Sequence, residues 1–195
     1  MKTTTFPQAS RQLILVRHGA TEPNLAGLRC GGDLDAPLTD LGRQQATQAA
    51  LRIRELGIAV GVIVASHLQR TRETAEIVGR LLDGVEVVIE PAFAERRLGA
   101  WNLHPVGATE RALNAGITPT GGESDADFVE RISRATQDQL LPRLEQRPLL
   151  VGSKGVARAL HVLVGLSVRD GLANGELIQI DMSAWARRET VGCDA

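Results

Sequence analysis

Short apolar runs that alternate with helical patterns constrain the fold of this chain more than any other feature. The runs are rich in Leu, Ile and Val with little polar alternation, which is typical of strands buried on both faces of a sheet. The five runs are Gln12–Arg17, Val60–Ala65, Val85–Ile89, Leu149–Val151 and Leu177–Asp181. Helical patterns fill 39–56, 67–82, 124–145 and 154–165. This alternation predicts a three-layer α/β/α sandwich around a mostly parallel central sheet.

The predicted helices begin at residues that commonly cap helices. Thr39 precedes the first helix, and Ser153 is a natural N-cap for the last one. Ser66 with Gln69, and Ser124 with Asp127, have the three-residue spacing of a capping box or a related start. We therefore expect the four helices to begin close to these positions.

Length and composition indicate one ordinary globular domain over residues 1–195, with 43% apolar and 23% charged residues. A net charge of −1 and the absence of tyrosine argue against nucleic-acid binding, and the charge predicts no attraction to anionic membranes. No apolar stretch has membrane-spanning length, and the start lacks a signal-peptide core, so we expect a cytoplasmic protein. Cys30 and Cys193 have no metal-ligand spacing and fit a reduced compartment.

Two long stretches, 18–38 and 91–124, interrupt the alternation with many glycines and prolines. Loops of this length in a compact domain are uncommon and usually functional. In open α/β sheets, ligands bind beyond the carboxyl ends of the strands. We therefore expect both stretches to form active-site loops over the end of the first strand.

The residues that follow the predicted strands are suited to phosphate chemistry. Arg17 and His18 end the first strand, Arg70 lies just after the second, and Glu95 follows the third. A guanidinium binds phosphoryl oxygens, an imidazole can attack phosphorus, and two arginines can stabilise the charge of a phosphoryl group in transfer. A carboxyl group can protonate the leaving oxygen and later deprotonate water.

These motifs together resemble the histidine phosphatase superfamily, also called the phosphoglycerate mutase-like family. The resemblance rests on six segments in the family's order and spacing. They are 17–24 (RHGATEPN), 35–46 with DAPLT and Gly42, 68–75 (LQRTRETA), Glu95 with Gly99 and Trp101, 121–124 (GGES), and 155–160 (GVARAL).

The resemblance implies a role for each matching position. His18 would be the nucleophile that forms a phosphohistidine, and Glu95 would be the general acid and base. Arg17 and Arg70 would hold the phosphoryl oxygens. The family needs no metal or other cofactor, because the arginines supply the positive charge that magnesium supplies elsewhere.

The resemblance also implies details of the loops and the assembly. Thr21 and Asn24 would help to orient the substrate or its phosphate. The last strand, near 177–181, would be an antiparallel edge. The partner would be a small phosphorylated molecule, and a homodimer is one expectation because family members are often dimers.

One position departs from the family's pattern. The family's fourth strand normally ends in Ser-His-Gly, and here Ser153 stands where that second histidine is expected. Its hydroxyl would contact the phosphate as a neutral donor in place of a charged imidazolium. The sequence leaves three replacements open, which are Lys154, His67 and His104.

These features favour a metal-independent phosphatase that hydrolyses a small phosphomonoester through a phosphohistidine. A first alternative is a weakly active or inactive homologue that binds a phosphorylated ligand, because Ser153 replaces the second histidine. A second is a phosphoglycerate mutase-type phosphoryl transferase, which the chain length disfavours because such mutases tend to be longer. A third is a specialised enzyme for an atypical phosphorus substrate.

Overall fold

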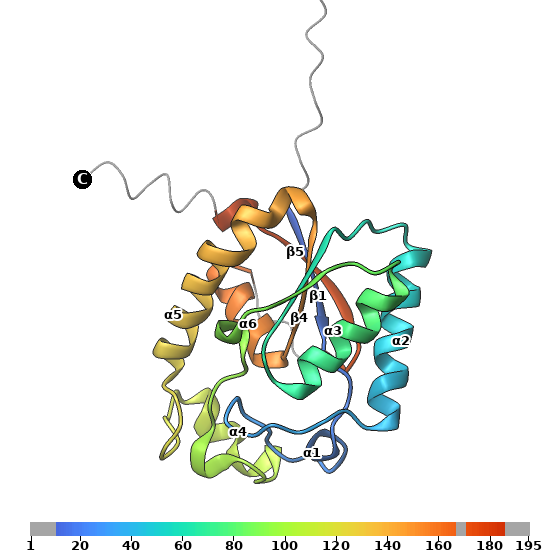
Figure 1. Ribbon diagram of the computed structural model, residues 1–195. Helices are drawn as coiled ribbons and strands as arrows, with labels where there is room; N and C mark the ends of the chain where they lie inside the picture. The colour runs from blue at the N-terminus through green and yellow to red at the C-terminus, as the bar shows by residue number, and fades with distance from the viewer. Residues whose placement is uncertain (1–10, 167–170, 186–195) are drawn as a thin grey trace, which may run out of the picture.

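A computed structural model describes residues 11–166 and 171–185. Five strands form one sheet in the order β3-β2-β4-β1-β5 (Figure 1). The strands are β1 Gln12–Arg17, β2 Val62–Ala65, β3 Val87–Ile89, β4 Pro148–Gly152 and β5 Leu177–Asp181. All neighbouring pairs are parallel except β1 with β5, which is antiparallel. The predicted mostly parallel sheet with an antiparallel edge strand is confirmed.

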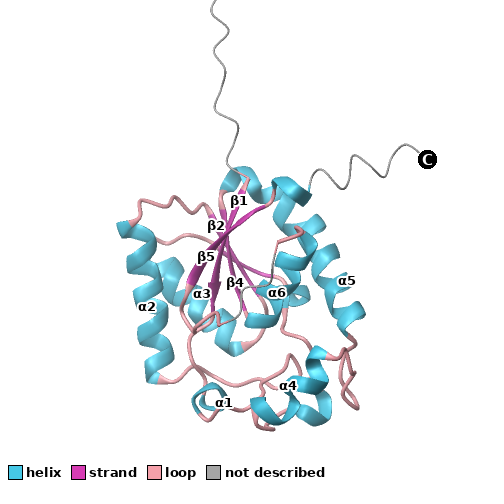
Figure 2. Cartoon of the chain, turned by 180° about the vertical axis from the view of Figure 1, so that it is seen from behind, coloured by secondary structure: helices cyan, strands magenta, loops and turns pink. Residues whose placement is uncertain are grey.

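Helices cover both faces of this sheet (Figures 1 and 2). On one side lie α2 (Asp40–Glu55) and α3 (Gln69–Leu81), and on the other lie α5 (Asp125–Ala135) and α6 (Lys154–Leu163). Successive residues of β1 point to opposite faces, so Leu13 and Leu15 join the α5–α6 core while Ile14 and Val16 join the α2–α3 core. Because both faces are buried, the central strands read as continuous apolar runs, as predicted.

The two outer strands differ from the prediction of strands buried on both faces. β3 is limited to three residues, and Ile89 is 41% exposed because β3 forms one edge of the sheet. β5 alternates buried and exposed residues, as expected for a strand that packs on one face only.

Three of the four predicted helix starts are confirmed, including Ser153, which accepts from the Val156 amide at 3.5 Å, and one is wrong. Thr39 accepts a hydrogen bond from the Gly42 amide at 3.0 Å, and Ser124 accepts one from the Asp127 amide at 3.0 Å. The predicted Ser66 capping box does not form, because α3 begins at Gln69. The Ser66 hydroxyl is buried and lies 2.7 Å from the hydroxyl of Thr71.

The helix predicted to extend from 124 to about 145 is shorter and less regular. The α-helix ends at Ala135 and continues as a π-helical turn, Thr136–Leu140, and a 3₁₀ segment, Leu141–Gln146. Pro142 explains the change, because proline has no amide N–H and its ring clashes with the carbonyl of the preceding turn.

The two long loops predicted to roof the site contain short helices that the sequence did not predict. They are α1 (Glu22–Leu25), α4 (Val106–Asn114) and two 3₁₀ turns, Pro91–Phe93 and Gly99–Trp101. The N-cap side chain of neither α-helix accepts a hydrogen bond. Figures 1 and 2 show both helices beyond the carboxyl ends of the parallel strands. The residues described include no helix with the length and apolar character needed to cross a membrane.

Candidate active site

Strand pairing places Ser153 directly beside His18. Arg17 is in register with Gly152 across the β1–β4 pair, and the His18 amide donates to the Gly152 carbonyl at 2.9 Å. Both chain segments therefore leave the sheet together, and both His18 and Ser153 are less than 5% exposed. The residue that replaces the expected second histidine thus lies at the position where the fold would place that histidine.

The imidazole of His18 is oriented by its own loop. Nδ1 lies 2.8 Å from the carbonyl oxygen of Gly19, which can only accept, so Nδ1 carries the proton and Nε2 has a free lone pair. Burial, followed by the charges of Arg70 and Arg17, lowers the pKa of His18 well below its usual value. The ring is therefore neutral near pH 7 and chemically suited to act as a nucleophile through Nε2.

A buried arginine, Arg70, and a partly buried one, Arg17, lie near His18. Arg70, in the first turn of α3, is 1% exposed and donates to the carbonyls of Leu34 at 2.9 Å and Gly31 at 3.1 Å. Arg17 donates to the Leu172 carbonyl at 2.6 Å. In the described part of the chain, Nε of each arginine is buried without a protein acceptor. A bound anion would supply such acceptors and offset the cost of burying these cations.

Glu95 extends from an irregular segment toward the N-terminus of α6. Its Oε1 accepts from the Arg96 amide at 2.7 Å, and Oε2 accepts from the Gly155 amide at 3.0 Å. A Cβ atom at position 155 would lie 2.0 Å from Oε1, so only glycine permits this approach. Burial lowers the pKa of Arg17, and the nearby negative charge of Glu95 partly offsets that effect. Glu95 therefore belongs to the same electrostatic group as the two arginines.

Asn24 and Thr21 lie in the loop after the nucleophile candidate. The Oδ1 atom of Asn24 accepts from the Thr21 amide at 3.2 Å and from the Asn174 side chain at 3.3 Å. Thr21 is fully buried, and its hydroxyl has no partner among the described groups. The structure thus gives Asn24 a clear part in ordering α1, whereas its predicted contact with substrate stays a prediction.

The three proposed replacements for the second histidine lie outside the buried pocket. Lys154 is the first residue of α6, His67 precedes α3, and His104 precedes α4, and all three are exposed. Ser153, by contrast, is buried and caps α6 through a 3.5 Å contact with the Val156 amide. The capping role predicted for Ser153 is therefore present, and its predicted contact with the phosphate stays a prediction.

Residues 172–176, which the sequence did not mark as part of the site, contact Arg17 and His18. The Leu172 carbonyl accepts from the Arg17 side chain. The Gly175 amide donates to the Arg17 carbonyl, and the Arg17 amide donates to the Glu176 carbonyl, both at 3.0 Å. The side chain of Asn174 donates to the His18 carbonyl at 2.9 Å. These contacts join residues more than 150 positions apart, and the sequence shows only a polar turn before the last strand.

Cys30 also lies near the pocket, in the loop after the nucleophile candidate. Its thiol contacts the Leu34 carbonyl at 3.7 Å, the same oxygen that Arg70 binds. Burial raises the pKa of this thiol, although the charge of Arg70 opposes the effect. Cys30 is therefore a neutral lining group, and Cys193 lies outside the described residues.

Known proteins share both the sequence pattern and the fold of this chain. The sequence model of the histidine phosphatase superfamily, branch 1, matches residues 13–185. The chain belongs to this superfamily. A protein of Escherichia fergusonii named as a probable phosphoglycerate mutase GpmB is 38% identical over 156 residues, covering 75% of this chain and 70% of that protein. A GpmB protein of Escherichia coli is 35% identical over 182 residues, covering 91% of this chain and 78% of that protein.

Similar solved structures include both an enzyme and a protein whose activity is not stated. A mycobacterial glucosyl-3-phosphoglycerate phosphatase, solved with VO3, has a TM-score of 0.71 and 30% identity, with 87% of this chain and 92% of that chain covered. TTHB049 of Thermus thermophilus has a TM-score of 0.72 and 28% identity, with 88% and 94% covered. The similar proteins thus include one named as a phosphatase and others named as probable mutases.

Proposed function

We propose that this protein is a metal-independent phosphatase that hydrolyses a small phosphomonoester through a phosphohistidine. The observation that carries the proposal is the buried, neutral His18, with its Nε2 lone pair free and with buried Arg70 and partly buried Arg17 close by. This arrangement presents a nucleophile and an anion-binding site in one pocket.

The reaction proceeds in two balanced steps. Nε2 of His18 forms a bond to phosphorus while the bond to the leaving oxygen breaks, and protonated Glu95 gives that oxygen its proton. Glu95, now a carboxylate, then removes a proton from water as the water oxygen attacks the phosphohistidine. Inorganic phosphate leaves, His18 regains its lone pair, and Glu95 regains its proton.

The test is hydrolysis of a chromogenic aryl phosphate, with and without a chelator, by the native protein and by His18→Ala. We expect chelator-resistant turnover in the native protein, loss of turnover in His18→Ala, and an acid-labile phosphoenzyme. A panel should add alkyl phosphates, 3-phosphoglycerate and glucosyl-3-phosphoglycerate, since relatives carry names that refer to the last two. Failure of the native protein to hydrolyse any member of the panel contradicts the proposal.

A second candidate function rests on Ser153. A hydroxyl is a weaker donor to a phosphoryl oxygen than an imidazolium, and losing one donor in such a pocket costs roughly 10²–10³ in rate in other enzymes. The protein would then bind a phosphorylated ligand with little turnover. Tight binding of orthophosphate without hydrolysis, together with turnover gained in Ser153→His, would favour this candidate.

A third candidate is a mutase, which the names of the GpmB relatives suggest. Interconversion of 2-phosphoglycerate and 3-phosphoglycerate faster than release of phosphate would support it. The cytoplasmic location and the homodimer also stay predictions, and size-exclusion chromatography with light scattering would test the second.

A further inference from the structure

Side chains supply many of the hydrogen bonds that hold the irregular segment carrying Glu95. Residues 94–98 form neither helix nor strand, so their backbone groups have no regular partners. A catalytic side chain on such a segment needs support from elsewhere, because a displacement of about 1 Å can cost roughly a hundredfold in rate. Within the described chain, that support comes mainly from Arg131 and Glu123.

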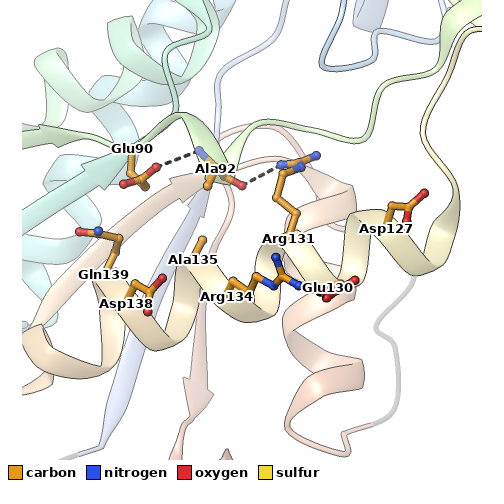
Figure 3. A pocket seen from close by; sticks show the side chains of 9 residues that line it. All are labelled: Glu90, Ala92, Asp127, Glu130, Arg131, Arg134, Ala135, Asp138 and Gln139. Carbon is orange, nitrogen blue, oxygen red and sulfur yellow. Dashed lines mark hydrogen bonds and ion pairs between the residues drawn. The ribbon is translucent and has the colours of Figure 1, made fainter.

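Arg131, on α5, binds three carbonyls of the segment. Nη1 donates to Ala92 at 2.7 Å and to Ala94 at 3.0 Å, and Nη2 donates to Glu95 at 3.4 Å. Figure 3 shows the side chain leaving α5 toward the segment, with the bond to Ala92 drawn as a dashed line. The arginine therefore binds the backbone carbonyls of Ala92, Ala94 and Glu95 itself.

Glu123 holds Arg131 in this orientation. Its two carboxylate oxygens accept from Nε at 2.9 Å and from Nη2 at 2.7 Å, a bidentate pair. Glu123 is 5% exposed and also accepts from the Arg97 amide at 3.2 Å. The centre of the Phe128 ring lies 5.1 Å from the guanidinium carbon of Arg131 and further restricts its plane.

All five N–H groups of Arg131 have acceptors, which excludes a direct role in binding phosphate. A guanidinium has five donors, and the contacts above use each one. The groove of about 420 Å³ beside it is lined by four acidic side chains, Glu90, Asp127, Glu130 and Asp138, and is unsuited to an anion (Figure 3).

We propose that the Arg131–Glu123 pair is a positioning device that holds the Glu95 carboxyl at the reacting phosphate. The proposal rests on the proposed function for its chemical meaning, since it assigns Glu95 as the general acid. Lysine could not replace Arg131, because one ammonium cannot span three carbonyls and both oxygens of Glu123.

The experiment compares Arg131→Lys and Glu123→Gln with Arg134→Lys as the matched control. Arg134 lies on the same helix and lines the same groove, but its ion pair is with exposed Glu130. The readout is kcat/KM across phosphomonoesters whose leaving groups range from acidic phenols to alkyl alcohols. An acidic phenol leaves without help from an acid, whereas an alkoxide needs the proton from Glu95.

We expect both pair variants to lose about 10- to 100-fold in kcat/KM for alkyl phosphates and less than about threefold for phosphates of acidic phenols. Arg134→Lys should match the native protein for every substrate. A uniform loss across the series, in step with the fraction of folded protein from thermal unfolding, would mean that the pair only stabilises the fold and would overturn the proposal. If Arg131→Lys does not fold, the isosteric Glu123→Gln variant decides.

A second readout does not depend on turnover. The amide proton of Gly155 hydrogen-bonds to Glu95, so its NMR chemical shift and its rate of exchange with solvent report that bond, and both should change in the pair variants. An unchanged Gly155 amide shift and exchange rate in folded variants would overturn the positioning role. If the native protein is inactive on every substrate but the pair variants show the expected changes at Gly155, the proposed function is refuted and the positioning role is retained.

Discussion

Replacing Gly155 with alanine should separate the role of Glu95 in catalysis from the stability of the fold. The new Cβ would lie 2.0 Å from Oε1 and 2.9 Å from Oε2 of Glu95. Normal contact requires roughly 3.5 Å, so the carboxylate must move by about 1.5 Å, and it loses its bond to the Gly155 amide. The carboxylate moves because it is the flexible partner, whereas the amide belongs to a helix.

A displacement of this size predicts a fall of about 10²-fold in kcat for an alkyl phosphate, equivalent to about 2.7 kcal/mol in the activation barrier. Stability should not fall, because alanine favours helix over glycine by up to about 1 kcal/mol. The assay pairs steady-state kinetics with thermal unfolding of the same preparation.

Gly107→Ala is the matched control for this substitution. Gly107 occupies the second position of α4, as Gly155 does in α6, and a Cβ there would meet nothing within 4 Å. It should therefore show the same small gain in stability with unchanged kinetics. A Gly155→Ala protein that is folded and has kcat within about twofold of the native value would refute the placement of Glu95 as the general acid.

Three further outcomes are expected. The folded state lowers the pKa of His18, so the contribution of neutral His18 to stability is complete above about pH 6.5 and is lost as the pH falls. Between about pH 7 and 5, the free energy of urea unfolding should therefore fall more steeply for the native protein than for His18→Asn, by at most about 1.4 kcal/mol per pH unit. Arg70→Lys removes the fork that binds the Gly31 and Leu34 carbonyls, so inhibition by vanadate should weaken at least about tenfold while the protein stays folded. Asn174→Ala removes the donor to the His18 carbonyl, so kcat should fall more than the vanadate affinity, and equal changes in both would contradict a role in orienting His18.

Much of the fold could be predicted from the sequence because its determinants are local. The apolar run before Arg17 specifies a buried strand, and Thr39 and Ser124 cap helices through amides only three residues away. The predicted end of α5 was wrong for an equally local reason, since the predicted helix included Pro142, which interrupts it.

The supporting groups of the site could not be predicted in this way. Arg131 reads as one more charged residue on an amphipathic helix, and its function depends on carbonyls about 40 residues earlier. Asn174 reads as a turn residue, and its partner is about 150 residues away. Such contacts leave no periodic or motif signal in a single sequence, because the fold alone brings the partners together.

The charge of the pocket predicts how the effect of Ser153 on activity depends on pH. Arg17 and Arg70 supply two positive charges, His18 is neutral, and Glu95 carries its proton when it acts as the general acid, which leaves two positive charges. These charges balance the dianion that a phosphomonoester forms above about pH 6. An imidazolium at position 153 would add a third positive charge beside the phosphoryl group, whereas the neutral hydroxyl adds only a hydrogen-bond donor. The gain in kcat/KM from Ser153→His should therefore be largest below about pH 6.5 and should shrink as the pH rises above that value, because the imidazole then loses its proton.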